Sequence, residues 1–181
     1  MYDSVAEQYD AFYDDAECTQ ENKLIKDFLE QPLQGCSTAF DIGCGTGLLL
    51  DISAITEPAK YIGIDPSAKM LEKFAEKHPA FKDRLVKCKM EEYDLTGIYD
   101  AVLVSLFGSP SYIHQEALIE LAEYAKTNNA TYFLMFYKKG YYSRILTGVI
   151  DTKHNNPEQV FPDLIEWKNY LIATNIPEWQ G

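Results

Sequence analysis

Short apolar segments alternate with segments of helical periodicity through most of this sequence, and this alternation restricts the fold more than any other feature. Strands are predicted at residues 38–42, 60–64, 84–88, 99–106 and 130–137. Strands that alternate with helices form a mostly parallel sheet that is covered on both faces. The sequence therefore predicts an α/β fold with a doubly wound sheet, in which ligands bind beyond the carboxyl ends of the strands.

The positions of the helices follow from apolar periodicity and from helix-breaking residues. Helices are predicted over residues 20–31, 48–57, 66–75 and 118–125, with a further helix near 156–164 and a strand near 167–173. The first helix is expected to end before Pro32, because proline lacks a backbone N–H and is poorly tolerated inside a helix. With no internal repeat or low-complexity tract, residues 1–181 are expected to form a single domain.

The charge balance is strongly acidic, with 16 lysine and arginine residues against 28 aspartate and glutamate residues and a formal net charge of −12. A chain of this charge repels phosphate backbones, which argues against a nucleic-acid partner. Lys138, Lys139 and Arg144 form the one candidate for a local basic patch.

Cysteine and histidine spacing argues against disulfides and against a metal site. The four cysteines lie far apart without a Cys-x-x-Cys pair, which favours reduced thiols in the cytoplasm. The three histidines stand alone, without ligand spacing to a cysteine or to each other, so no metal is expected. No apolar run approaches the ~20 residues that span a bilayer, and the first residues do not resemble a secretory signal. We therefore expect a cytoplasmic protein with no membrane association.

A glycine-rich turn, Asp41-Ile42-Gly43-Cys44-Gly45-Thr46-Gly47, joins the first predicted strand to its helix. Alternating glycines allow positive φ and let a ligand approach the backbone. The N–H groups at the start of the following helix favour an anionic group such as a carboxylate. Asp41 supplies the opposite sign and can accept a hydrogen bond from an ammonium. This pairing fits the amino-acid end of a ligand, with Cys44 as a small filler rather than a nucleophile.

Asp65 ends the second predicted strand, beside the glycine turn. An acidic residue at this position can accept hydrogen bonds from both hydroxyls of a ribose. It can equally be a simple helix cap, because Asp65 precedes Pro66 and Ser67. The glycine spacing differs from the Gly-x-Gly-x-x-Gly of dinucleotide sites and lacks the ending of a P-loop.

The run FDIGCGTG followed by YIGIDPSAKML closely resembles the class I S-adenosylmethionine-dependent methyltransferases. The opening AEQYDAFY resembles the segment that caps the cofactor in many of their small-molecule members. The resemblance implies a Rossmann-like fold, S-adenosyl-L-methionine as cofactor and residues 1–31 as an N-terminal helical cap. The residues expected at the cofactor are Tyr9, Tyr13, Asp41, Gly43, Cys44, Gly45, Gly47, Asp65, Pro66, Met70, Met90, Glu91, Ser105 and Phe107.

Two places after the third and fourth strands depart from the family pattern or carry little information. Where many members show an Asp-Ala pair at the adenine, this chain has Lys89-Met90 with Glu91 next, so either Glu91 or a backbone group takes that role. Residues 105–112, SLFGSPSY, lack the Asn/Asp-Pro-Pro-Tyr signature of DNA and protein amide methyltransferases. This segment is more similar to that of small-molecule N- or O-methyltransferases.

Methyl transfer from a sulfonium is an in-line displacement, for which alignment of the reactants matters most. Where the acceptor must lose a proton, His114, with Tyr112 beside it, is the candidate catalytic group. Tyr137, Tyr141 and Tyr142 are either the wall of an acceptor pocket or surface tyrosines after a buried strand. Tyr9, Tyr13 and Met70 have the alternative role of ordinary core packing.

Three functions remain open from the sequence. The leading hypothesis is methyl transfer to an N or O atom of a small molecule. The second keeps the fold but has a protein or RNA as acceptor, and the third is a non-catalytic subunit that binds S-adenosylmethionine. Because the chain after the fifth strand is short, the acceptor site is either open to a larger partner or completed by a second copy of the chain in a homodimer.

Overall fold

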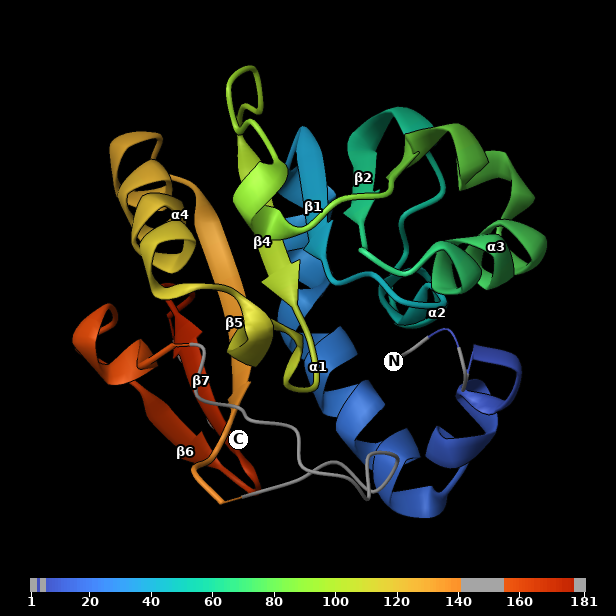
Figure 1. Ribbon diagram of the computed structural model, residues 1–181, viewed down its shortest axis with the longest axis horizontal. Coiled ribbons are helices and arrows are strands. Elements are labelled where there is room, and N and C mark those ends of the chain that lie inside the picture. The colour runs from blue at the N-terminus through green and yellow to red at the C-terminus, as the bar shows by residue number, and fades with distance from the viewer. Residues whose placement is uncertain (1–2, 4–5, 141–154, 178–181) are drawn as a thin grey trace.

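The computed structural model describes residues 3, 6–140 and 155–177. Its centre is a seven-stranded sheet with the strand order β3-β2-β1-β4-β5-β7-β6 (Figure 1). The strands are β1 (Thr38–Ile42), β2 (Tyr61–Ile64), β3 (Leu85–Val86), β4 (Ala101–Ser105), β5 (Thr131–Tyr137), β6 (Ile165–Trp167) and β7 (Tyr170–Thr174). Strands β1 to β5 pair in parallel, whereas β7 is antiparallel to both β5 and β6. The predicted doubly wound, mostly parallel sheet is confirmed.

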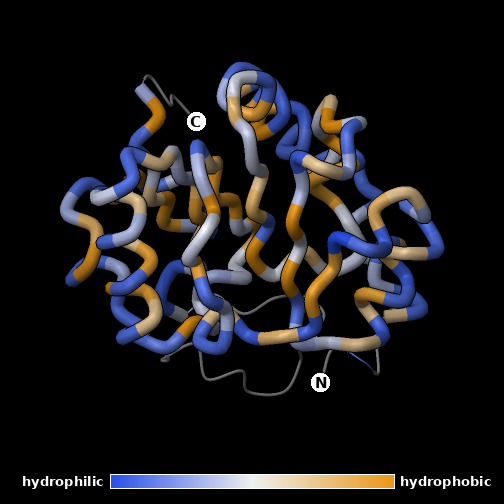
Figure 2. The backbone as a smooth tube through the Cα atoms, turned by 90° about the horizontal axis from the view of Figure 1, so that it is seen from above, coloured by the Kyte–Doolittle hydropathy of each residue, from blue (hydrophilic) through white to orange (hydrophobic). Residues whose placement is uncertain are grey.

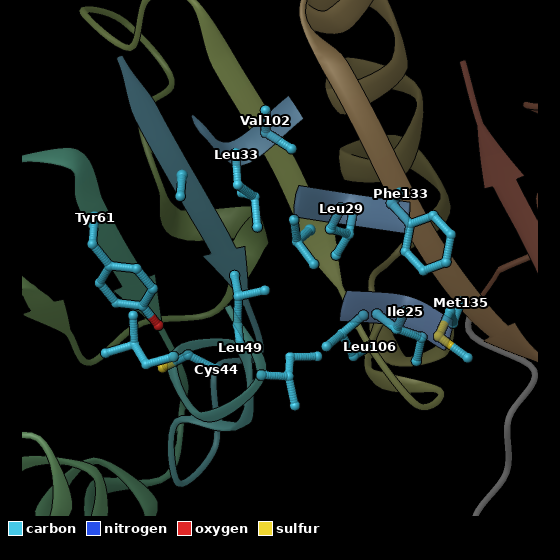
Figure 3. Close-up of a cluster of buried hydrophobic side chains, with 14 of the residues drawn as sticks. Ile25, Leu29, Leu33, Cys44, Leu49, Tyr61, Val102, Leu106, Phe133 and Met135 are labelled. Carbon is cyan, nitrogen blue, oxygen red and sulfur yellow. The ribbon is translucent and has the colours of Figure 1, made fainter. Parts of the chain in front are cut away.

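Helices cover both faces of this sheet and bury a separate apolar cluster against each. The helices are α1 (Ala16–Gly35), α2 (Leu48–Ile52), α3 (Ala68–Lys77) and α4 (Gln115–Thr127). Helices α1, α2 and α3 contribute to one cluster, part of which is drawn in Figure 3, and α4 packs into the other. Figure 2 shows the hydrophobic residues concentrated along the central strands and the hydrophilic ones on the periphery. Burial of this apolar surface is the main term that stabilises the fold.

Short 3-10 helices make up many of the connections. They are η2 (Ala6–Gln8), η3 (Asp10–Tyr13), η4 (Pro58–Lys60), η5 (Pro79–Arg84), η6 (Met90–Glu92), η7 (Ser109–Tyr112) and η8 (Pro157–Gln159). Two of them, η2 and η3, precede α1 and lie with its first turns beyond the carboxyl ends of β1 and β4 (Figure 1).

The predicted end of the first helix is wrong, because α1 continues through Pro32 to Gly35. Ile25, Leu29 and Leu33 follow one another at four-residue spacing and are all buried against the sheet. Their burial on both sides of the proline holds the helical backbone across it, so tertiary packing outweighs the unfavourable propensity of one residue.

The prediction for the last part of the chain is only partly correct. The helix expected near 156–164 is wrong, because only the short η8 forms there. The strand expected near 167–173 is a hairpin of β6 and β7. Its turn falls at Lys168, which adopts a left-handed φ of 50°. The predicted tyrosines Tyr141 and Tyr142 lie outside the described residues.

Among the described helices, none is long and apolar enough to cross a membrane. The described residues also contain no group of three or more histidine, cysteine, aspartate or glutamate side chains placed to bind a metal ion.

Candidate active site

The order of the strands reverses between β1 and β4, and the glycine turn lies at this switch point. The N–H groups of Gly43 and Cys44 both donate to the carbonyl of Ile64 at the end of β2, at 2.9 and 3.0 Å. Gly43 has a φ of +71°, and a Cβ atom there would lie 2.8 Å from the Cβ of Ser109 in the loop after β4. The turn is therefore held close to both neighbouring strand ends, and only glycine fits at position 43.

Asp65 connects the glycine turn to the start of α3. One carboxylate oxygen accepts a hydrogen bond from the Gly45 N–H at 3.0 Å, and the other accepts one from the Ser67 N–H at 2.8 Å. Burial raises the pKa of Asp65, while these two N–H groups act in the opposite direction. The helix start that follows is capped by the Ser67 hydroxyl, which accepts from the N–H of Met70. Asp65 therefore takes part in the helix start and also fixes the turn.

Asp41 is buried at the end of β1 with the hydroxyl of Tyr61 donating to it at 2.7 Å. The pKa of Asp41 is raised to about 7: burial raises it most, the Tyr61 hydrogen bond lowers it, and the nearby Asp65 also raises it. Cys44 lies beside Tyr61 (Figure 3), and burial raises the pKa of its thiol well above the usual value. Cys44 is therefore a buried thiol, in agreement with its predicted role as a filler.

The raised pKa of Asp41 predicts a specific pH dependence of folding stability. An unfolded aspartate releases its proton near pH ~4, whereas native Asp41 keeps it up to about pH 7. The native state therefore binds more protons in this window, and the contribution of Asp41 to stability falls as the pH rises through it. We expect Asp41→Asn, whose amide oxygen can still accept from Tyr61, to gain stability relative to wild type as the pH rises from about 4 to about 7, and the difference to level off above that.

Urea unfolding of both proteins at several pH values measures this difference. The exposed Asp163, changed to asparagine, is the matched control, and its difference from wild type should stay constant. An equally constant difference for Asp41→Asn would show that the native Asp41 titrates in the ordinary range.

Two adjoining cavities open at the carboxyl ends of the central strands, with volumes of about 470 and 280 Å³. The larger is lined by Tyr9, Tyr13, Asp41, Gly43, Cys44, Gly45 and Phe107 among the predicted cofactor residues. The smaller is lined by Tyr9, Gly43, Gly45, Asp65, Pro66, Met70, Met90, Glu91 and Phe107. Of the 14 residues predicted at the cofactor, all but Gly47 and Ser105 therefore face one or both cavities.

Gly47 and Ser105 lie next to the cavities without lining them. Gly47 has a φ of +98° at the start of α2, and a Cβ atom there would lie 2.7 Å from the ring of His78. The hydroxyl of Ser105 donates to the carbonyl of Ile42 at 2.6 Å. Gly47 thus allows close packing at the start of α2, and Ser105 joins the ends of β4 and β1.

The predicted catalytic residues Tyr112 and His114 both line the smaller cavity. The carboxylate of Glu91, which lines the same cavity, accepts a hydrogen bond from the backbone N–H of His114 at 2.6 Å. This contact ties the segment after β3 to the start of α4. It places both base candidates beside Met90 and Glu91, the residues expected near the adenine.

Polar contacts fasten the N-terminal segment over the cavities. The hydroxyl of Thr46 donates to Asp10 at 2.5 Å, and the ammonium of Lys77 lies 2.9 Å from the same carboxylate. Glu7 pairs with Lys73 of α3 at 2.9 Å. These contacts place Tyr9 against both cavities and Tyr13 against the larger one.

The sequence analysis did not predict that α1 and β7 form one wall of the larger cavity. Glu21 and Asn22 of α1 line it together with Tyr170. A signal existed for Glu21, because it continues the buried four-residue spacing of Ile25 and Leu29 and is therefore an acid on an apolar stripe. No such signal existed for Tyr170, because its position depends on the hairpin.

A sheet of this order with cavities at its switch point defines a Rossmann-like α/β protein that binds a ligand beyond the strand ends. The sequence model of the methyltransferase domain family matches residues 39–128. The matched residues run from β1 through α4 and include the glycine turn and Asp65, and over this part the chain is similar to the class I S-adenosylmethionine-dependent methyltransferases. No curated protein sequence matches the chain significantly.

Solved structures of methyltransferases share the fold. DesVI of Streptomyces venezuelae is 22% identical, with a TM-score of 0.57 over 76% of this chain and 60% of DesVI. The sugar N-methyltransferase KedS8 of a Streptoalloteichus species is 19% identical, with a TM-score of 0.54 over 75% of this chain and 56% of KedS8. CalS10 of Micromonospora echinaspora, an amino pentose methyltransferase, is 20% identical, with a TM-score of 0.51 over 66% of this chain and 50% of CalS10. The chain thus spans between half and three fifths of the length of these proteins.

Proposed function

We propose that the protein transfers a methyl group from S-adenosyl-L-methionine to an N or O atom of a small molecule. The observation that carries the proposal is the contact between the Asp65 carboxylate and the Gly45 N–H at 3.0 Å, where the two cavities adjoin. This contact joins Asp65, the residue predicted to bind the ribose, to the turn predicted to bind the methionine end of the cofactor. The names of the structural neighbours, which include sugar methyltransferases, also support a small acceptor.

In this proposal the cofactor bridges the two cavities. Adenosine would lie in the smaller one, where Asp65 would hold its ribose hydroxyls and Met70 and Met90 would lie near its base. The methionine end lies on the glycine turn, where an ammonium group would favour the ionised form of Asp41. The acceptor enters the rest of the larger cavity.

The proposed role of the chain in the reaction is to align the acceptor atom, the methyl carbon and the sulfur. The bound cofactor supplies an activated methyl group on a positively charged sulfur. Tyr9 and Tyr13 cover the site from the N-terminal segment and reduce its contact with water. His114 and Tyr112 remain predictions as proton acceptors, on the adenosine side of the site.

Thermal unfolding in the presence of candidate cofactors tests the proposal. S-adenosylmethionine and S-adenosylhomocysteine, each at ~100 times its dissociation constant, should add ~2.7 kcal/mol to the stability of the folded state. NAD should have no effect, because the glycine spacing differs from that of dinucleotide sites. Absence of stabilisation by both sulfur compounds, or an equal effect of NAD, would overturn the assignment.

A further inference from the structure

Beyond the glycine turn, the larger cavity extends to α1 and to the β6–β7 hairpin. We call this region the acceptor chamber and define it by Glu17, Glu21, Asn22, Tyr137 and Tyr170, which all line the cavity. The whole cavity of about 470 Å³ lies in the range typical of small-molecule sites, so it has room for an acceptor next to the end of a cofactor.

The described lining of the larger cavity is strongly acidic. It contains six acidic side chains, those of Asp10, Asp14, Glu17, Glu21, Asp41 and Asp51, of which Asp41 keeps its proton up to about pH 7, and the single ammonium group of Lys77. Lys77 is already paired with Asp10 at 2.9 Å and with Asp51 at 2.6 Å. The described part of the lining therefore favours a cation and disfavours an anion.

Of the two acids that define the chamber, Glu21 is the more buried, with 7% of its surface exposed. The ammonium of Lys168, from the β6–β7 turn, lies 2.8 Å from Glu21 and 3.5 Å from Glu17. This contact raises the pKa of Lys168, so the lysine stays charged. One ammonium group thus pairs with two carboxylates, so Glu17, Glu21 and Lys168 together carry a net negative charge at the chamber wall.

Asn22, the next residue of α1, provides an independent observation. Its Oδ1 atom is buried and has no hydrogen-bond partner within the described part of the chain. A buried acceptor without a donor is unfavourable, and a ligand N–H group would satisfy it. An ammonium group offers three donors and no acceptor, which matches a wall of carboxylate and amide oxygens.

Aromatic rings form another part of the lining. Tyr137 stacks on Tyr170 with 5.9 Å between ring centroids and 28° between planes. Phe107 meets Tyr170 edge-on at 5.7 Å. Aromatic faces attract ammonium groups, and the attraction is stronger where water is excluded.

We propose that the methyl acceptor is an amine, which enters the chamber as an ammonium ion and is held by Glu21 and Asn22 against Tyr137 and Tyr170. This inference rests on the proposed methyl transfer. The ammonium gives one proton to water, and the nitrogen lone pair then forms a bond to the methyl carbon. The carbon–sulfur bond breaks with its electron pair remaining on sulfur. The positive charge moves from sulfur to nitrogen, so it stays among the carboxylates, whereas a hydroxyl acceptor would give a neutral ether.

Matched pairs of amines and alcohols test the proposal on the wild-type protein saturated with S-adenosylhomocysteine. The pairs are benzylamine and benzyl alcohol, cyclohexylamine and cyclohexanol, and glucosamine and glucose. At millimolar concentration at least one amine should raise the melting temperature by about 2 °C or more, and its alcohol should not. Equal shifts within every pair, or no shift with any of the six compounds, would overturn the proposal.

Glu21→Gln then tests the residue assignment, with Glu30→Gln on the exposed face of the same helix as control. Glu21→Gln should weaken binding of the amine at least about tenfold, while its affinity for S-adenosylhomocysteine stays within about twofold of wild type.

Asn22→Leu is the second variant, used if loss of the Lys168 contact in Glu21→Gln impairs folding, and it should also weaken amine binding. Unchanged amine binding in both variants would contradict the assignment. Failure of the wild type to bind S-adenosylhomocysteine would instead refute the proposed function.

Discussion

Gly108→Ala is expected to destabilise the protein by about 2–4 kcal/mol. Gly108 follows β4 with a φ of +85°, a conformation that costs alanine about 1–2 kcal/mol. A Cβ atom there would also lie 2.1 Å from the ring of Tyr137. The ring cannot move easily, because it stacks on Tyr170 of β7. Denaturant unfolding with S-adenosylhomocysteine absent measures the loss.

Gly97→Ala is the matched control for this effect. Gly97 has nearly the same φ of +89°, but no atom outside its immediate neighbours lies within 4 Å of the position of a Cβ atom. Gly97→Ala should therefore lose only the about 1–2 kcal/mol that a positive φ costs an alanine. Equal losses in the two variants would show that the Tyr137 ring yields without cost and that the loop after β4 is loosely packed.

The second large effect is expected for Asp65→Ala, which should weaken binding of S-adenosylhomocysteine 10- to 100-fold, or ~1.4–2.7 kcal/mol. The substitution removes the proposed acceptor of the ribose hydroxyls. It also removes the hydrogen bonds to the N–H groups of Gly45 and Ser67, so the glycine turn loses its contact with the start of α3. Titration calorimetry measures the affinity directly.

Asp163→Ala, at an exposed acid that lines neither cavity, controls for the change in net charge. Its affinity should equal that of wild type. An unchanged affinity of Asp65→Ala would mean that the ribose is held by other groups and that Asp65 serves only the turn and the helix start.

The elements that the sequence predicted well have strong local signals. Strand β1 was predicted at its observed bounds, because an apolar run leads directly into the glycine turn. The start of α3 followed from Ser67, whose hydroxyl does cap the helix. The nearness of Asp65 to the turn could also be predicted, since parallel neighbouring strands end at the same edge of the sheet.

The features that the sequence did not reveal depend on contacts between distant segments. The continuation of α1 past Pro32 depends on the burial of Leu33 against the sheet. The hairpin of β6 and β7 depends on the edge that β5 offers to β7. For the same reason Tyr170 could not be placed in the site, although Tyr137 was identified as a candidate for an acceptor pocket.

The two sides of the larger cavity differ in how firmly they are anchored. On the side of α1, Glu21 belongs to the helix whose Ile25 and Leu29 are buried in the core, so this side cannot shift without disturbing the centre of the molecule. On the other side, the N-terminal segment is held to α3 by exchangeable contacts such as Glu7 with Lys73. If the proposed methyl transfer holds, the α1 side would be the rigid wall that an acceptor must fit, and we expect acceptor and product to enter and leave on the N-terminal side.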